Sequence, residues 1–136
     1  MKYILIIFIF LTSNINAKSL YDKAMHAYAK GQKQKAAQYF ETSCNKGNAK
    51  SCHALANLYL RGNGVTKNTQ KALDLLEDSC AALYTSSCLY LAFLYKDGTN
   101  VKQNDITSQY YFKIACRRGS KTACKATKSI LIPTNW

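Results

Sequence analysis

Six cysteines at regular intervals are the residues of this 136-residue chain whose spacing says most about its chemistry. They occupy positions 44, 52, 80, 88, 116 and 124, so intervals of 8 and 28 residues alternate. A spacing that occurs three times favours local disulfides over the many other pairings that six cysteines allow. In the chain-entropy model, closing each short loop stabilises the fold by roughly 2.5 kcal/mol. We therefore predict the bridges Cys44–Cys52, Cys80–Cys88 and Cys116–Cys124.

Metal binding is the alternative use of regularly spaced cysteines. Zinc ligands usually come in close pairs with two to four intervening residues, whereas these pairs are separated by seven. Only two histidines, His26 and His53, are present to complete a ligand set. The sequence therefore predicts structural disulfides, with no metal site and no cofactor.

The N-terminus has the pattern of a secretory signal peptide. A basic residue, Lys2, precedes an apolar run from Ile4 to Leu11, and a small residue, Ala17, follows a short polar stretch. The apolar run is less than half of the roughly 20 residues that a bilayer requires, so we expect no stable membrane insertion. We predict a signal peptide over 1–17 and a single domain over 18–136. The mature protein would be periplasmic or secreted, where disulfides form readily.

The chain is strongly basic, with a formal net charge of +12, which loss of Lys2 with the leader lowers by one. After Asp105 the sequence has no carboxylate side chain, while Lys113, Arg117, Arg118, Lys121, Lys125 and Lys128 follow. Such a field favours an anionic partner. We expect no nucleic acid partner, because an exported protein rarely meets nucleic acid and no recognition motif accompanies the charge.

An internal repeat of 36 residues specifies the elements that carry the cysteines. This shift superimposes Leu55, Ala56, Leu58 and Tyr59 on residues of the same type, and the glycine at position 62 on the one at 98. The apolar residues have helical spacing, so we predict a first helix from about 52 to 61 that ends at a glycine. Asn68 is then a plausible N-cap of a second helix. That helix has an expected buried stripe of Ala72, Leu75, Leu76 and Ser79.

The repeat predicts an all-α solenoid of stacked helix pairs. We place the repeats at about 19–51, 52–87 and 88–123, with the first helix of the first pair beginning near Tyr21. A capping helix lies within 121–136. Each bridge would join the end of one pair's second helix to the start of the next pair's first helix. The expected product is a short right-handed superhelix with one concave face.

Several of these residues resemble a known family. The pattern of Leu58-Tyr59, Gly62, Gly64-Val65, Asn68 and Lys71-Ala72 looks like the Sel-one-like repeat, a relative of the tetratricopeptide repeat. With the cysteine pairs and the signal peptide, the chain closely resembles the Helicobacter cysteine-rich protein family over residues 19 to 124. The resemblance implies a secreted or periplasmic α/α solenoid. It also implies binding of penicillin or slow hydrolysis of β-lactams, and interaction with a host.

The β-lactamase activity implied by this resemblance has one candidate site in the sequence. Serine β-lactamases use a nucleophilic serine with a lysine one helical turn later, and Ser43 and Lys46 have this spacing. The other motifs of those enzymes do not follow. We therefore favour an ordinary helix surface for both residues and regard the catalytic pair as the alternative.

Binding has its own candidates on the first helices of the pairs. Positions 53, 57 and 60 share one helix face and differ between repeats, whereas the core positions stay constant. We call the candidates on this face the first-helix stripe, and they are His26, His53, Asn57, Leu89, Phe93 and Lys96. The tyrosines at 28, 59 and 95 are assigned to packing between repeats.

Two functions are therefore expected for the mature chain, which we predict to be a monomer. The first is a binding scaffold for an extended peptide, a cell-wall fragment such as a muropeptide, or a host protein. The second is a β-lactamase or penicillin-binding protein that opens the β-lactam ring slowly.

Overall fold

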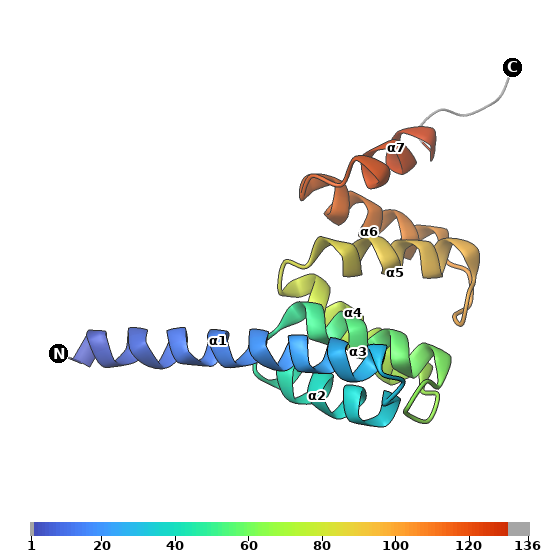
Figure 1. The fold of residues 1–136 in the computed structure, drawn as a ribbon. Helices are drawn as coiled ribbons and strands as arrows, with labels where there is room; N and C mark the ends of the chain where they lie inside the picture. The colour runs from blue at the N-terminus through green and yellow to red at the C-terminus, as the bar shows by residue number, and fades with distance from the viewer. Residues whose placement is uncertain (1, 131–136) are drawn as a thin grey trace, which may run out of the picture.

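The computed structural model describes the backbone of residues 2–130 and the side chains of residues 16–128. Helices α1 and α2, α3 and α4, and α5 and α6 form three antiparallel pairs, and α7 packs on α6 (Figure 1). This arrangement confirms the all-α repeat fold. The helices are α1 (Lys2–Ala29), α2 (Lys33–Asn45), α3 (Ala49–Arg61), α4 (Thr69–Ala81), α5 (Thr85–Asp97), α6 (Asp105–Arg117) and α7 (Lys121–Ile130).

Asparagine and glycine set the helix ends as their side chains predict. The side chain of Asn68 accepts a hydrogen bond from the backbone N–H of Lys71 at the start of α4, which confirms it as the N-cap. Gly62 ends α3 in the left-handed conformation with φ of 63°. Helix α3 begins at Ala49 rather than near Cys52, because the side chain of Asn48 caps it three residues earlier than predicted.

One loop glycine fixes how the first two pairs approach each other. Gly64 has φ of 79°, and a Cβ added there would lie 2.5 Å from the carbonyl carbon and oxygen of Lys33. The loop between α3 and α4 therefore lies directly on the first residue of α2. Only glycine permits this contact without a shift of the backbone.

Helix α3 is the centre of the core because it packs on both sides. Its Leu55 and Leu58 join a cluster with Phe40 and the alanines of α1 and α2. Its Ala56 and Leu60 join a second cluster that continues through α4, α5 and α6 to α7. Tyr59 packs against both clusters, so the two are continuous. Burial thus runs from one helix pair to the next, as stacking of repeats requires.

The three predicted disulfides are present. They join Cys44 to Cys52, Cys80 to Cys88 and Cys116 to Cys124, with Cα–Cα distances of 4.7, 4.9 and 4.6 Å. Each bridge links the end of a second helix to the start of the next helix. The residue three positions after the first cysteine has positive φ in every case: Gly47 at 88°, Leu83 at 69° and Gly119 at 91°.

Helix α1 differs from the prediction that the first helix begins near Tyr21. It runs without a break from Lys2 to Ala29, and its N-terminal part projects beyond the packed helices (Figure 1). In the part of the chain that the structure describes, no helix combines the length and hydropathy needed to cross a membrane. The cut after Ala17 stays a prediction, and residues 131–136 of the expected cap lie outside the described residues.

Candidate functional site

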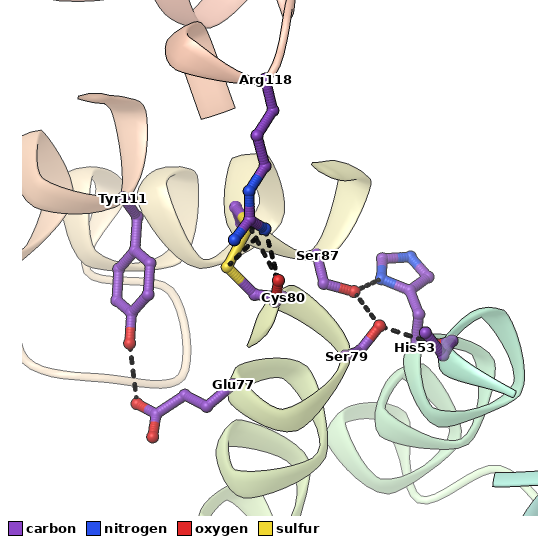
Figure 2. The surroundings of a disulfide bond; sticks show 9 residues. His53, Glu77, Ser79, Cys80, Ser87, Tyr111 and Arg118 are labelled. Atoms are coloured by element: carbon purple, nitrogen blue, oxygen red, sulfur yellow. Dashed lines mark hydrogen bonds between the residues drawn. A yellow bond between two sulfur atoms is a disulfide. The ribbon is translucent and has the colours of Figure 1, made fainter. Parts of the chain in front are cut away.

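A chain of hydrogen bonds connects α3 to the middle disulfide region (Figure 2). The Nδ1 atom of His53 lies 2.8 Å from the hydroxyl of Ser87, which lies 2.7 Å from the hydroxyl of Ser79. The Ser79 hydroxyl donates to the carbonyl oxygen of Ala49 over 2.7 Å. Both serines are fully buried. The network therefore ties the start of α3 to the end of α4 and the start of α5.

The order of donors in this chain fixes the tautomer of the histidine. The one hydroxyl hydrogen of Ser79 is used on the Ala49 carbonyl, so Ser87 must donate its own hydrogen to Ser79. Ser87 can then only accept from His53, whose Nδ1 must carry a hydrogen. The neutral ring consequently keeps Nε2 as a hydrogen-bond acceptor.

The His53 imidazole is half-buried and lies against two aromatic rings. Burial lowers the pKa of His53, since a charged ring is poorly solvated there. The rings of Tyr84 and Tyr90 meet it edge-on, with centroids 5.3 and 5.6 Å away. His53 is therefore a neutral, half-buried group held in one orientation.

The first repeat contains an equivalent serine pair, and it includes the predicted nucleophile. Ser43 is fully buried, so the expected helix-surface position is wrong for this residue. Its hydroxyl donates to the carbonyl oxygen of Ala17 over 2.6 Å and accepts from the hydroxyl of Ser51 over 2.7 Å. Lys46 is exposed beyond the end of α2, and no hydrogen bond between these two described residues is present. This environment is that of a structural hydroxyl rather than an accessible nucleophile.

An arginine side chain lies against the middle disulfide. The guanidinium of Arg118 donates to the carbonyl oxygen of Cys80 and lies 3.1 Å from the sulfur of Cys88 (Figure 2). The residue 36 positions earlier is Ala82, which has no polar side chain. The Tyr111 hydroxyl donates to Glu77 over 2.9 Å, and burial raises the pKa of that tyrosine. These contacts hold α6 against α4 and the bridge.

An open apolar hollow of about 160 Å³ lies where α1, α2 and α3 meet. Met25, which is 43% exposed, contributes to its rim. Asn57 also contributes, and its side-chain amide donates to the carbonyl oxygen of His53 one turn earlier. The lining residues are Met25, Tyr28, Phe40, Ala54, Asn57 and Leu58.

The structure brings only part of the first-helix stripe together. His53 and Asn57 lie on successive turns of α3, and Asn57 lines the hollow together with Met25 of α1. His26, which follows Met25 in the sequence, is exposed and does not line the hollow. Phe93 instead packs edge-on against Phe112 of α6, with centroids 5.1 Å apart. Leu89 is half-buried against the core, and Lys96 is exposed. Leu60, which shares the predicted face, is buried.

The serine pairs were not predicted, although the sequence contains a signal for them. A serine directly precedes the cysteine at positions 43, 51, 79 and 87, four of the six sites. At the third bridge the same positions hold Ala115 and Ala123, which are also fully buried. Within the described residues, no group of three or more His, Cys, Asp and Glu side chains could hold a metal ion.

Comparison with known proteins places this geometry in a family. The family model described as Sel1 repeat matches residues 22–48, 49–82 and 85–120. The chain therefore belongs to the Sel1 repeat family, as a cysteine-rich protein of the Helicobacter type. Helicobacter pylori cysteine rich protein B is 30% identical to it, with a TM-score of 0.63 over 68% of this chain and 70% of that chain.

Two further solved structures share the fold. A Sel1 repeat protein from Oxalobacter formigenes has 19% identity and a TM-score of 0.68, over 88% of this chain and 96% of that one. A protective antigen of uropathogenic Escherichia coli with an SLR fold has 17% identity and a TM-score of 0.72, over 84% of this chain and 25% of that chain. A comparison with curated protein sequences gave no match.

Proposed function

We propose that this protein is an exported binding scaffold that holds an extended peptide on the face formed by α1, α3 and α5. The observation that carries the proposal is the apolar hollow between α1 and α3, which lies beside the variable positions of the first-helix stripe. Repeat solenoids use such faces for extended ligands. A peptide segment of a wall fragment or of a host protein would meet the same groups.

The polar groups around the hollow suit a peptide ligand. A side chain of the ligand enters the hollow, whose lining is almost entirely apolar. The Nε2 acceptor of His53 lies on the same helix as Asn57, and the two can bond backbone or side-chain donors of the ligand. Because His53 is held by Ser87, it binds without a large loss of rotamer entropy.

Export is supported by the bridges and by the N-terminal sequence. Three disulfides require an oxidising compartment, and cytosolic proteins rarely keep them. The leader predicted over 1–17 would direct the chain there. Mass spectrometry of the exported protein tests the cut, because cleavage after Ala17 leaves Lys18 as the first residue.

Hydrolysis of β-lactams, the alternative function, has little support among the described residues. In the uncleaved chain Ser43 is buried and its hydroxyl donates to the carbonyl oxygen of Ala17, so a substrate cannot reach it in this conformation. Cleavage after Ala17 would remove this acceptor and leave the hydroxyl of Ser51 as the hydrogen-bond partner of Ser43. Steady-state hydrolysis of a chromogenic cephalosporin tests this directly. We expect no turnover that depends on Ser43, so a saturable rate that disappears in Ser43→Ala would establish the enzyme instead.

The binding proposal is tested with peptides selected from a random library against the oxidised protein. Met25→Lys places a charge at the rim of the hollow and should weaken binding of a selected peptide by at least about tenfold. Gln38→Lys, an exposed position of α2 outside the hollow, is the matched control. Equal loss in both variants, or no effect of Met25→Lys, would overturn the proposal.

A further inference from the structure

The outward face of α6 carries an unusual row of exposed side chains. Ile106, Tyr110, Lys113 and Arg117 follow the i, i+4, i+7, i+11 spacing of one helix face and are all exposed. Ile106 is 84% exposed and Tyr110 is 60% exposed. We call these four residues the α6 outer stripe. It has two large apolar residues at one end and two cations at the other.

The same positions in the other second helices give an internal comparison. Thirty-six residues earlier, α4 carries Gln70, Asp74, Glu77 and Ala81. Another 36 residues earlier, α2 carries Gln34, Gln38, Glu41 and Asn45, and all eight residues are exposed. Two repeats therefore fold with a polar or acidic stripe. The apolar and basic residues of α6 are not required by the repeat, which indicates a separate role at the surface.

The charge around the α6 outer stripe is mostly positive. Asp105, exposed at the start of α6, is the one carboxylate on α6 and α7, and residues 106–130 contain none. Helix α7, which packs on α6, adds three exposed lysines spaced along one face: Lys121, Lys125 and Lys128. Arg118, which follows the last residue of α6, is turned inward against the middle disulfide. The cations on α6 and α7 remain available to an anionic surface.

We infer that the α6 outer stripe and the lysines of α7 dock on the surface of an anionic phospholipid bilayer. Ile106 and Tyr110 enter the headgroup region, where an apolar side chain and a ring with a polar tip are both stable. The cations pair with lipid phosphates, and each such cation adds attraction near an anionic leaflet. The stripe is a ridge on the outside of one helix, so it fits a flat, deformable surface.

This inference is independent of peptide binding. The first-helix stripe and its hollow belong to α1, α2 and α3, whereas the lipid-binding residues belong to α6 and α7. A bilayer on the α6 outer stripe would leave the hollow free. The protein would then present its peptide site from a membrane surface without an inserted helix.

Vesicle co-sedimentation of the exported, oxidised protein tests the inference. Vesicles of phosphatidylglycerol and phosphatidylcholine are compared with phosphatidylcholine alone, and we expect binding to the former only. The double variant Ile106→Gln with Tyr110→Gln gives α6 the polar residues found on α2, and it should lower the partition coefficient by about tenfold. Lys113→Gln with Arg117→Gln should lower it by a similar factor.

Two controls separate a lipid surface from general attraction of charge. Lys30→Gln with Lys35→Gln removes two exposed cations from the opposite end of the chain and should change binding less than about twofold. All variants share one N-terminus, so α1 contributes equally to each. The inference is overturned if the native protein does not bind anionic vesicles. It is also overturned if the Ile106 and Tyr110 double variant binds them as tightly as the native protein does. It is equally overturned if soluble poly-glutamate binds as tightly as the vesicles do, because then charge alone suffices.

Discussion

Ser43 and Ser51 beside the first bridge, and Ser79 and Ser87 beside the second, are buried hydroxyl pairs in the wall between helix pairs. At the third bridge two alanines fill the same space. The position therefore accepts two hydrogen-bonded hydroxyls or two methyl groups. At the first bridge, loss of Ser43 alone would leave the buried hydroxyl of Ser51 without its acceptor, which costs more than losing both hydroxyls.

Substitution of the first serine pair should therefore be non-additive. We expect Ser43→Ala to lower the free energy of unfolding by about 1–3 kcal/mol, because the buried hydroxyl of Ser51 then loses its acceptor. The double variant with Ser51→Ala should lower it by about 1 kcal/mol less than the sum of the two single changes. Urea denaturation of the four proteins measures this coupling. Strict additivity would show that the two hydroxyls do not interact.

The lowered pKa of His53 makes the stability of the folded protein depend on pH in a predictable direction. Burial lowers this pKa in the folded state from its ordinary value of 6.5, so the unfolded chain binds the proton more readily. The stability that the neutral His53 ring contributes is fully present above pH 6.5, and it declines as the pH falls toward the pKa of the folded state. We expect the stability difference between the native protein and His53→Gln to shrink between pH 7.5 and about 5. Urea titrations across this range measure it, and a difference that grows toward acid pH would refute the assigned burial effect.

At this scale the sequence predicted the bridges but not their surroundings. A repeated spacing was sufficient to pair the cysteines. The hydroxyl of Ser43 donates to a carbonyl 26 residues away, and the imidazole of His53 bonds a hydroxyl 34 residues away. Local spacing gives no information about such partners, so the serine-lysine spacing suggested a surface site where the structure has a packed one.

The turn after α4 contains a leucine in a backbone conformation that disfavours residues with a side chain. Leu83 has φ of 69° and a side chain that is 73% exposed, while the equivalent Gly47 and Gly119 have positive φ without a side chain. A branched side chain in the left-handed region costs roughly 1–2 kcal/mol, and little packing offsets it. The helix end is therefore less stable than its two counterparts.

We expect Leu83→Gly to stabilise the protein by up to about 1 kcal/mol, since part of the gain is lost to the greater freedom of glycine when unfolded. Gly47→Leu is the reverse change at the equivalent position and should destabilise the protein by about 1 kcal/mol or more. Thermal melting of both variants measures the effect. A lower Tm for Leu83→Gly would mean that the exposed leucine makes a stabilising contact.

Most helix ends could be predicted because their signals are local. Gly62 and Asn68 cap the helices as expected, since each acts on the backbone within a few residues. Helix α3 starts earlier than predicted because its N-cap, Asn48, precedes Cys52, where the recurring residues begin. The continuous α1 was not predicted, because the leader pattern of residues 1–17 and the first repeat helix are separate signals in the sequence.

At the scale of the whole molecule, the three disulfides should supply much of the stability of the stacked repeats. Every bridge spans the junction between one helix pair and the next helix, and each closes a short loop worth roughly 2.5 kcal/mol. Reduction of all three should lower the Tm by more than about 15 °C. Calorimetry with and without reductant measures this. An unchanged transition would mean that helix packing alone determines stability.

The 36-residue repeat predicted the fold of the molecule but did not predict its functional surfaces. Core positions such as Ala56 and Leu55 recur at a fixed interval and are buried, so periodicity identifies them. The hollow beside Met25 arises where three helices meet, and the α6 outer stripe appears only when exposed positions are compared between repeats. Sequence periodicity marks what the repeats share, whereas function resides in what differs.

The central claim is that the face formed by α1, α3 and α5 binds a peptide. The most direct test is to titrate a library-selected peptide into the isotope-labelled, oxidised protein and map the amide shifts by NMR. We predict that the largest shifts cluster around Met25, His53 and Asn57, while α6 stays unchanged. Shifts centred on Ser43 or on the α6 outer stripe, with none around the hollow, would contradict the account.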